Sequence, residues 1–509
     1  TQTQTQTQTQ TQTQTQIQTQ IQTQTQTQTQ TQTRGPMMLT MMGSLKTIKV
    51  RLLMTNLADK LSQSLSQIQV QRASSQGVLT RVVGLTLEAT GVNAPVGSYC
   101  DIISPSGSTL VAEVVGFGDG KLLLMPFGSV QGIAAGFKVK PQSQTQSTAM
   151  SRSMLGRVLD GMGQPLDGGP DNVAEEHRSI LGQSINPLKR RPIDQALDVG
   201  VRSINALLTV GCGQRLGLMA GSGVGKSVLM GMMTRFTQAE VIVIGLIGER
   251  GREVQEFVLD SLGEEGLARS VVVAAPGDTS PVTRLHAARL ATTIAEFFRD
   301  QGKSVLLLMD SISRVAQAQR EIGLAIGEPP TTKGYPPSVF TLIPNLMERA
   351  GNGHEDGQGA ITAFYTVLAE GDDQLDPVVD AARSVLDGHI VLSRELAGAG
   401  HYPAIDINQS ISRLAPALQG LGQKQAGQQL RQWLNSYAEN KDLITVGAYQ
   451  AGKNIVLDQA LDKKLNMDRF LQQGMHDSCD MATSLDHLQI LAQPPQHEFQ
   501  QSETLQAMP

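Results

Sequence analysis

The sequence predicts three folded parts in one chain: a small N-terminal β-barrel, a central α/β domain with a mostly parallel sheet, and a C-terminal α-helical domain. Short apolar runs separated by glycine-bearing turns fill residues 77–141, which is typical of a small closed barrel. Strand and helix patterns alternate from Arg202 to about Arg413, which is typical of a parallel sheet flanked by helices. After Arg413, apolar residues recur at helical spacing.

Changes in composition set the expected boundaries between these parts. We expect a low-complexity tail and linker over 1–49, an amphipathic helix over 50–72, the barrel over 77–145, the central domain over 146–413, the helical domain over 414–494 and a flexible tail over 495–509.

Residues 1–34 are an almost unbroken Thr-Gln repeat with almost no charge and no helical period. Such a segment cannot bury a core, so it is expected to be disordered. We interpret this segment as a tail or as translated repeat DNA upstream of the true start codon. The methionines at 37, 38, 41 and 42 are plausible start positions. Self-association is the functional alternative.

Residues 50–70 carry one apolar stripe on a predicted helix, formed by Leu53, Leu57, Leu61, Leu65 and Ile68. The stripe precedes the first folded part, so it fits a partner-binding arm as well as a core helix.

The amino-acid composition limits the classes of protein to which this chain can belong. Of 509 residues, 40% are hydrophobic and 17% charged, which is ample for a large core in more than one domain. The net charge of −5 gives no overall basic footprint for nucleic acid. The three cysteines lie far apart and are expected to be reduced thiols, and no apolar run reaches membrane-spanning length. A soluble, cytoplasmic protein is expected.

The barrel strands are expected at Val78–Leu85, Tyr99–Ile103, Thr109–Phe117 and Lys121–Met125. Pro141–Ser153 is expected to be a polar linker. The basic trio within Pro187–Pro192 is expected to be a solvated turn.

In the central domain, ligands are expected to bind at the strand C-termini. The expected strands are Leu216–Ala220, Val241–Ile247, Val271–Ala275, Val305–Met309, Ala360–Val367 and His389–Leu392.

A phosphate-binding loop follows the first of these strands. Ala220–Ser227 reads A-G-S-G-V-G-K-S, with Ala220 at the usual first glycine. The glycines let backbone N–H groups turn inward around a phosphate, and the following helix adds its dipole. Lys226 is predicted to reach the β- and γ-phosphates and the Ser227 hydroxyl to ligate Mg²⁺. The predicted cofactor-binding residues here are Gly221, Ser222, Gly223, Val224, Gly225, Lys226 and Ser227.

Two further strand ends carry carboxylates. Glu249 follows the second strand, where it is placed to polarise a water in line with the γ-phosphate; an ion pair within its charge-dense turn is the alternative. Asp310 ends the fourth strand after Leu306–Met309, a Walker B pattern that faces Mg²⁺. Arg314 could reach the phosphates from the same edge or form a surface ion pair.

Pro403–Arg413 follows His401-Tyr402 and matches P-A-x-D-x-x-x-S-x-S-R. With it the core resembles the catalytic subunits of the rotary ATPases, which implies a RecA-like α/β P-loop ATPase that uses ATP and Mg²⁺. The resemblance implies that Arg413 completes a neighbouring subunit's site and that Tyr402 stacks on adenine, although Tyr402 could also be ordinary core packing. It also implies that Glu249 is the catalytic glutamate, that Arg250 contacts the γ-phosphate, and that Asp310 and Arg314 match the Walker B pair.

Longer stretches resemble the type III secretion ATPases, and the loop Pro276–Pro281 is most similar to the flagellar protein export ATPase. This resemblance implies a cytoplasmic homohexamer, peripheral to the inner membrane, that energises export. The implied partners are a stator-like regulatory protein bound through 50–72, an export gate, a central stalk-like protein and chaperone–cargo complexes. The stretches that carry it are Gly248–Phe257, Phe298–Arg314, Ala318–Phe340, Leu346–Gly353 and Glu370–Arg394.

Departures and alternatives remain. Asp198–Asn205 and Cys212 differ from the family's usual residues without removing a catalytic position. A virulence-type secretion ATPase and a proton-translocating rotary subunit share the chemistry. A nucleic-acid translocase would need basic and aromatic strand-binding elements, whereas only 4% of the residues are aromatic. A purely regulatory subunit should lack the carboxylate at Glu249.

Overall fold

The computed structural model describes residues 76–142, 147–221, 223–355, 357, 359–368 and 376–493. The chain divides into two compact units, Thr1–Ala73 and Ser74–Pro509, and every described residue belongs to the second. The predicted Thr-Gln tail, the predicted helix over 50–72 and the predicted tail over 495–509 therefore lie outside the described residues.

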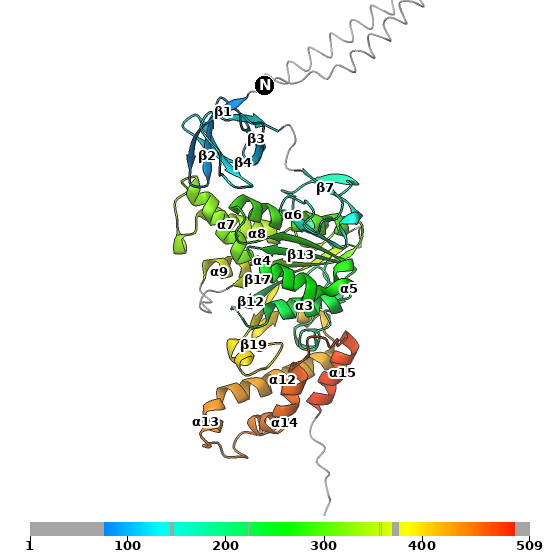
Figure 1. Ribbon diagram of the computed structural model, residues 1–509. Helices are drawn as coiled ribbons and strands as arrows, with labels where there is room; N and C mark the ends of the chain where they lie inside the picture. Colours follow the sequence, from blue (N-terminus) through cyan, green and yellow to red (C-terminus); the bar gives the residue numbers. More distant parts are fainter. Residues whose placement is uncertain are drawn as a thin grey trace, which may run out of the picture. The chain divides into compact units, whose positions relative to one another are not determined.

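The first folded part is a closed β-barrel, as predicted (Figure 1). Its strands follow the order β1-β2-β5-β4-β3-β6, and fully buried side chains such as Leu87, Cys100 and Leu124 fill its interior. The sequence predicts four of these strands and misses β2 and β6, because polar residues interrupt their apolar pattern. The strands are β1 (Gly77–Val83), β2 (Thr86–Thr90), β3 (Tyr99–Ile103), β4 (Thr109–Gly118), β5 (Lys121–Pro126) and β6 (Lys138–Pro141).

The central part is a sheet in the order β19-β18-β12-β17-β15-β13-β14-β8, with β16 pairing β17 off this path. All six predicted strands are present. Each pair along this order is parallel except β18 with β19. The strands are β8 (Arg157–Asp160), β12 (Arg215–Ala220), β13 (Val241–Ile247), β14 (Ser270–Ala275), β15 (Ser304–Asp310), β16 (Gly351–Asn352), β17 (Ala360–Leu368), β18 (Gly388–Leu392) and β19 (Ile405–Ser412).

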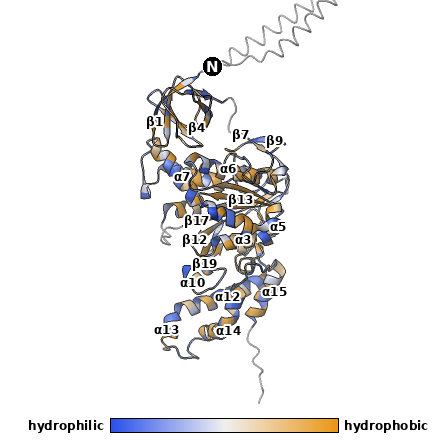
Figure 2. Cartoon of the chain, viewed as in Figure 1, coloured by the Kyte–Doolittle hydropathy of each residue, from blue (hydrophilic) through white to orange (hydrophobic). Residues whose placement is uncertain are grey.

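Helices cover both faces of this sheet, whose central strands are coloured hydrophobic in Figure 2. Along β15, Leu307 packs with α6, α7 and α8, whereas Leu306 and Leu308 pack with α3 on the other face. This alternation is the two-residue period of a strand buried on both sides. The helices are α3 (Lys226–Phe236), α4 (Gly251–Glu256), η4 (Phe257–Leu262), α5 (Gly263–Ala268), α6 (Pro281–Asp300), α7 (Ile312–Ala325), η5 (Thr332–Gly334), α8 (Pro337–Met347), α9 (Pro377–Arg383) and α10 (Arg394–Gly398).

The structure corrects the segment between barrel and sheet. Ser147–Met150 forms β7, which pairs with β9 (Glu176–Ser179), so the predicted polar linker over Pro141–Ser153 is wrong there. Met150 is fully buried, which anchors β7 to the core. The remaining short elements are η1 (Arg152–Met154), η2 (Pro187–Lys189), β10 (Ala196–Leu197), η3 (Ile204–Leu208) and β11 (Val210–Gly211).

The basic trio that begins at the end of η2 is not simply a solvated turn. The Arg190 guanidinium donates hydrogen bonds to the carbonyl oxygens of Ala350 and Glu348, both at 2.6 Å. Arg190 therefore fastens this segment to the end of α8, which the sequence could not show because the two lie far apart in the chain.

The C-terminal part is helical, as predicted. Trp433 on α12 and Met467 on α14 are buried in the same apolar cluster as one face of the sheet. The helices are α11 (Ala415–Leu418), α12 (Leu421–Glu439), α13 (Lys441–Thr445), α14 (Ile455–Leu471) and α15 (Met481–Ala492).

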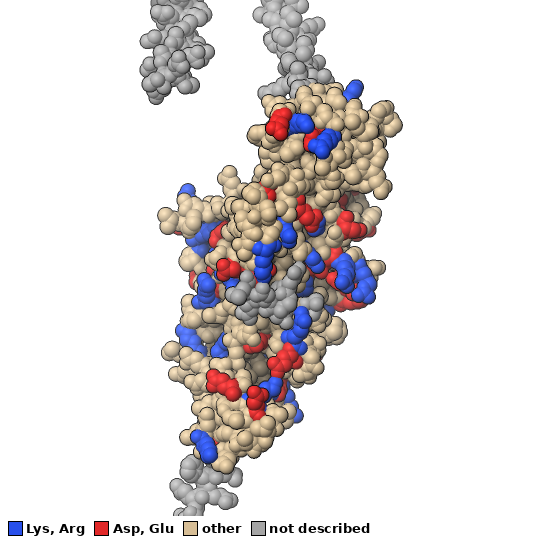
Figure 3. Space-filling model, turned by 90° about the vertical axis from the view of Figure 1, so that its left-hand side faces the viewer, with Lys and Arg blue, Asp and Glu red and all other residues tan. Residues whose placement is uncertain are grey.

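Two surface properties bear on function. On the face shown in Figure 3, lysine and arginine are interspersed with aspartate and glutamate. Within the described ranges, no helix combines the length and the apolar character that a membrane span requires.

A buried histidine lies where the barrel meets the sheet domain. The ring of His286 on α6 lies 5.7 Å from Phe127 and 6.1 Å from Tyr99, measured between ring centroids. Its Nδ1 hydrogen-bonds the Gly161 carbonyl. Burial lowers the pKa of His286 from 6.5 to about 4, and the nearby Arg289 charge acts in the same direction.

We expect this histidine to make stability fall with acidity. Between pH 6.5 and 4 the unfolded chain binds a proton that the folded chain does not, so the folded state weakens as the pH falls. From pH 6.5 to 5 the loss attributable to His286 should be about 2 kcal/mol. Chemical unfolding at both pH values should show this loss in the wild type and a smaller one in His286→Asn. The same pH dependence in both proteins would contradict the assignment.

Candidate active site

The phosphate-loop sequence forms a turn between β12 and α3. β12 ends at Ala220 and α3 begins at Lys226, so the start of the helix faces the loop. Gly223 and Gly225 have φ of 77° and 90°, a left-handed conformation that favours glycine. Such a loop presents backbone N–H groups to an anion at a helix N-terminus. Ser222 lies outside the described residues.

The Tyr402 ring packs against this loop. A Cβ placed on Gly225 would lie 3.2 Å from Cε1 and 3.3 Å from Cδ1 of Tyr402. Tyr402 is 44% exposed, so ordinary core packing, the alternative to adenine stacking, is not its environment. An open aromatic face beside a phosphate loop is suited to stacking on a base.

We expect Gly225→Ala to weaken nucleotide binding, because the methyl group strains the loop and displaces the Tyr402 ring. The test is a double-mutant cycle with Tyr402→Ala, read out as the Kd of a fluorescent ATP analogue. The two changes should be coupled by about 0.5–3 kcal/mol. Strictly additive effects would contradict a shared base-binding surface.

Three charged side chains meet at the carboxyl edge of the sheet. Lys226 Nζ lies 2.5 Å from Asp310 Oδ1 and 3.5 Å from Glu249 Oε1. They come from α3, the end of β15 and the second residue after β13, which are brought together by the order of strands in the sheet. The side chains are only 5–13% exposed. The structure therefore brings the predicted lysine and both carboxylates together in one cluster that is largely shielded from solvent.

Within this cluster, the surroundings of Glu249 shift its pKa. Burial, followed by the negative charge of Asp310, raises the pKa of Glu249 to about 7, and Lys226 opposes this rise. A carboxylate with a pKa near neutrality can accept a proton at physiological pH, which is the property of a general base. Among the described residues, the ion pair of Glu249 is the 3.5 Å contact with Lys226 on α3, whereas Arg250 of its own charge-dense turn pairs with Glu253.

Thr366 is a site residue that sequence reasoning missed. Its hydroxyl donates a 2.6 Å hydrogen bond to Asp310 Oδ1 from the neighbouring strand β17, and it is fully buried. The bond fixes the orientation of the Asp310 carboxylate. The available signal was a threonine near the carboxyl end of the mostly apolar strand Ala360–Leu368, which also carries Thr362.

The other predicted residues near this edge, Ser227, Arg314 and Arg250, are not part of the charged cluster. Ser227 is exposed at the start of α3. Arg314 packs its aliphatic stem on Gly248, where a Cβ would lie 2.7 Å from Arg314 Cβ, and it donates a hydrogen bond to Gln317. Arg250 is 81% exposed and lies 3.5 Å from Glu253. In the single chain, Arg314 and Arg250 therefore flank the cluster without joining it.

Arg413 lies at the opposite edge of the sheet. Because β19 is antiparallel to β18, Ile405 pairs with Leu392 at the carboxyl edge, and Ser412 pairs with Gly388 at the amino edge. Arg413 N bonds the Asp387 carbonyl, and Asp387 N bonds that of Arg215, the first residue of β12. The P-loop follows the last residue of this six-residue strand, roughly 20 Å away at 3.3 Å per residue. The strand direction thus separates Tyr402 from Arg413.

The donors present fit a nucleotide with a divalent cation. Asp310 and Ser227 offer oxygen ligands, which Mg²⁺ prefers, and Lys226 offers a point charge for phosphate. Within the described residues, no group of three or more His, Cys, Asp or Glu side chains could cage a metal alone. This suits Mg²⁺, which is usually held by one or two protein oxygens together with substrate phosphates.

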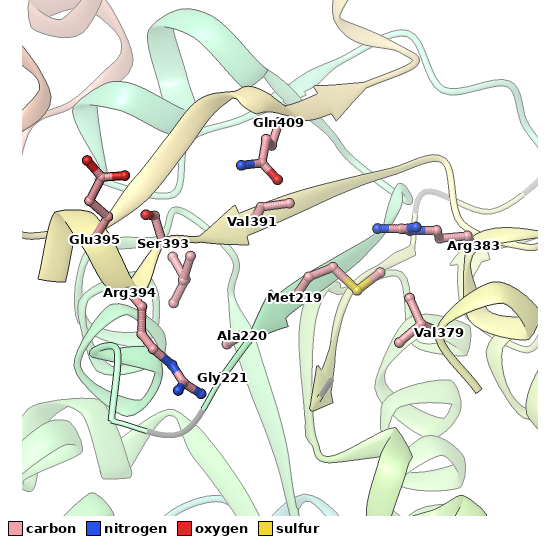
Figure 4. Close-up of a pocket in the computed structure, with 11 residues that line it drawn as sticks. Met219, Ala220, Gly221, Val379, Arg383, Val391, Ser393, Arg394, Glu395 and Gln409 are labelled. Carbon is pink, nitrogen blue, oxygen red and sulfur yellow. The ribbon is translucent and has the colours of Figure 1, made fainter. Parts of the chain in front are cut away.

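A pocket of about 270 Å³ adjoins the loop from the side of β18. Ala220 and Gly221 form part of its wall. In Figure 4, the Arg394 side chain extends toward Gly221, whereas Arg383 lies on the side of Met219 and Val379. The pocket therefore shares a wall with the phosphate loop.

Sequence profiles of known families match three parts of the chain. The nucleotide-binding domain of the ATP synthase alpha/beta family matches residues 200–412, and the β-barrel domain of the same family matches residues 79–142. The C-terminal domain of the T3SS EscN ATPase matches residues 421–490.

Curated relatives and solved structures agree with these matches. The flagellum-specific ATP synthase of Pseudomonas aeruginosa is 59% identical over 82% of this chain and 93% of its own length. The type 3 secretion system ATPase of Xanthomonas euvesicatoria is 47% identical over 78% of this chain and 89% of its own. The assembled ATPase EscN of enteropathogenic E. coli aligns with a TM-score of 0.78 at 40% identity, covering 82% of this chain and all of EscN. A structure of EscN with its central stalk EscO aligns with a TM-score of 0.76 at 39% identity, with the same coverage.

Proposed function

Since the chain belongs to the ATP synthase alpha/beta family, among the flagellum-specific ATP synthases and type 3 secretion system ATPases, we propose that it is the ATP-hydrolysing subunit of a homohexameric ring that energises flagellar protein export. The observation that carries this proposal is the arrangement of charges. Lys226, Glu249 and Asp310 meet at one edge of the sheet, and Arg413 lies at the other edge of the same sheet. A complete site then requires the Arg413 of another copy.

In this proposal each side chain has one task. The loop amides and Lys226 bind the phosphates, and Tyr402 stacks on the base. Asp310, oriented by Thr366, and Ser227 hold Mg²⁺, which when bound neutralises charge on the phosphate oxygens. Glu249 orients the attacking water and accepts its proton at Oε1 or Oε2. Arg413 of the neighbouring subunit stabilises the charge that develops on the transferred group.

Arg250 and Arg314 have supporting tasks in this proposal. Arg250 directly follows Glu249 and is exposed, so it is free to turn toward the γ-phosphate when a nucleotide binds. Arg314 supports the backbone before Glu249 through its contact with Gly248, and in this proposal it approaches the phosphates from the same edge.

The flagellar reading is favoured over two alternatives. The flagellum-specific relatives of Pseudomonas aeruginosa and Salmonella typhimurium are 59% and 54% identical to the chain, against 47% for the secretion ATPase of Xanthomonas euvesicatoria. The match of residues 421–490 to the EscN C-terminal domain argues against a proton-translocating rotary subunit.

Several partners follow from the same proposal. EscN was solved in complex with its central stalk EscO, which supports a stalk-like partner for this chain. We extend the proposal to a stator-like regulatory protein bound by residues 50–72, to an export gate and to chaperone–cargo complexes. Their location would be cytoplasmic and peripheral to the inner membrane.

The test is ATP hydrolysis measured against protein concentration, with and without Mg²⁺. Assembly obeys mass action, so specific activity should rise with concentration and reach a plateau when rings are complete. Chelating Mg²⁺ with EDTA should abolish turnover, and adding Mg²⁺ back should restore it. Concentration-independent activity, together with a monomer in sedimentation velocity, would contradict the ring.

A further inference from the structure

A basic groove lies between β19 and the first half of α12. It has a volume of about 760 Å³, and three cations line it: Arg413, Lys424 and Arg431. None of the described residues that line it is Asp or Glu. Ile411, which is 49% exposed, adds an apolar surface to it.

The charges of this groove are not neutralised within the described part of the chain. Arg431 donates its hydrogen bonds to the backbone carbonyls of Leu207, Ile407 and Ser410, which carry no net charge. Among the described residues, neither Lys424 nor Arg413 has a side-chain partner. Three unpaired positive charges in one concave surface repel one another and attract an anionic occupant.

An acidic stripe of the same chain offers the opposite charge. Glu253, Glu256 and Asp260 lie on α4 and η4, at spacings of three and four residues that place them on one side. Glu264 follows on α5, after Gly263, whose φ of 63° and ψ of −175° interrupt the helical run. Glu265 adds a fifth acid. Arg250 and Arg252 each lie 3.5 Å from one of these carboxylates, and the Arg235 guanidinium donates hydrogen bonds to the backbone carbonyls of Asp260 and Ser261. Within the stripe, Leu259 is 64% exposed.

The groove and the stripe are each joined to one half of the proposed active site. Arg413 itself lines the groove, and Glu249 lies two residues before α4, where the stripe begins. If the stripe of one copy fills the groove of the next, Arg413 of the second copy comes close to Glu249 of the first. A single arrangement of two neighbouring subunits would therefore both form the charge contact and complete the active site.

We propose that the basic groove of each subunit receives the acidic stripe of the adjacent subunit and thereby sets the position of Arg413 at the neighbouring site. This inference rests on the proposed ring function and specifies the surface that assembles it. The contact is head-to-tail, because the two surfaces differ, and a head-to-tail contact generates a ring when its rotation closes. The occupant is a second copy because every copy carries both surfaces.

The test reverses charges on both surfaces without touching the proposed catalytic residues. The groove variant is Lys424→Glu with Gln428→Glu, and the stripe variant is Asp260→Lys with Glu264→Lys. None of these four side chains has a hydrogen-bond or ion-pair partner in the part of the chain that the structure describes, so the fold should tolerate the changes. The readouts are the protein concentration at half-maximal ATPase activity and the ring population in sedimentation velocity.

Each variant alone should raise that concentration about tenfold or more, because like charges then face each other across the contact. The plateau activity should stay near that of the wild type, since Arg413 still reaches the site once rings form. The chain carrying all four changes should assemble within about threefold of the wild type, because the charges are again complementary. Asp462→Lys, an exposed change of the same sign on α14, should have no effect and controls for net charge.

Three results would overturn the inference. If the fourfold variant assembles no better than either parent variant, the two surfaces do not pair, although the ring itself stands. If the wild type shows neither rings nor concentration-dependent activity, the proposed function fails and the pairing fails with it. An unchanged assembly in the groove variant would mean that the groove receives something other than a second copy.

Discussion

Arg413→Ala is expected to lower the saturating rate of ATP hydrolysis by about 10³-fold or more, the magnitude typical of a removed arginine finger. The reason is the position of this residue at the edge of the sheet opposite to the P-loop of its own chain. Its guanidinium can act only on a site of another copy. The measurement is the steady-state rate at saturating ATP and at a protein concentration where wild-type rings are complete.

Two controls separate the finger from assembly and from charge. Sedimentation velocity should still show rings for Arg413→Ala, and the Kd of a fluorescent ATP analogue should change little. Lys441→Ala removes an exposed cation that pairs with Glu395, and it should leave the rate within about twofold, as surface ion pairs usually do. A normal rate in assembled Arg413→Ala rings would contradict the role in trans.

Glu249→Gln is expected to lower the rate by about 10²–10⁴-fold, the range of general acid–base catalysis. The amide keeps the shape of the side chain but cannot accept the proton of the attacking water. Nucleotide binding should persist, because Lys226 and the loop glycines are unchanged. Single-turnover hydrolysis and ATP-analogue binding, measured on the same preparation, separate the two effects.

The raised pKa of Glu249 also predicts the direction in which kcat/KM changes with pH. Glu249 must be ionised to act as a base, and its pKa in the nucleotide-free protein is raised to about 7. Because kcat/KM reports the pKa of the free enzyme, it should rise between about pH 6 and 8 and then level off. The rise should disappear in Glu249→Gln. An unchanged pH profile in this variant would show that another group limits the acidic side.

Much of the central domain is predictable from local sequence. Each apolar run of the sheet is bounded by polar or glycine residues, so the six strands are found within a residue or two of their ends. The P-loop is equally clear, because Gly223 and Gly225 must adopt positive φ. Glu249 and Asp310 are found because they lie at or just beyond the ends of buried strands. The carboxyl ends of parallel strands meet at one edge.

What the sequence misses depends on contacts between distant residues. Thr366 is a site residue only because β17 pairs with β15, and Arg190 is fastened only because its segment reaches α8. The antiparallel direction of β19 is the most consequential of these. It separates Tyr402 from Arg413 although both belong to one short signature, and no local pattern sets the direction of a strand.

The roles of the site residues stay predictions, and a mixing experiment tests their common basis most directly. Glu249→Gln and Arg413→Ala subunits, each nearly inactive alone, are unfolded or dissociated together and reassembled in equal amounts. If Arg413 acts in trans, about a quarter of the interfaces pair an intact Glu249 with an intact Arg413, and activity should return in proportion. Mixed rings that remain as inactive as either parent would contradict the account, because every site would then depend on residues of one chain.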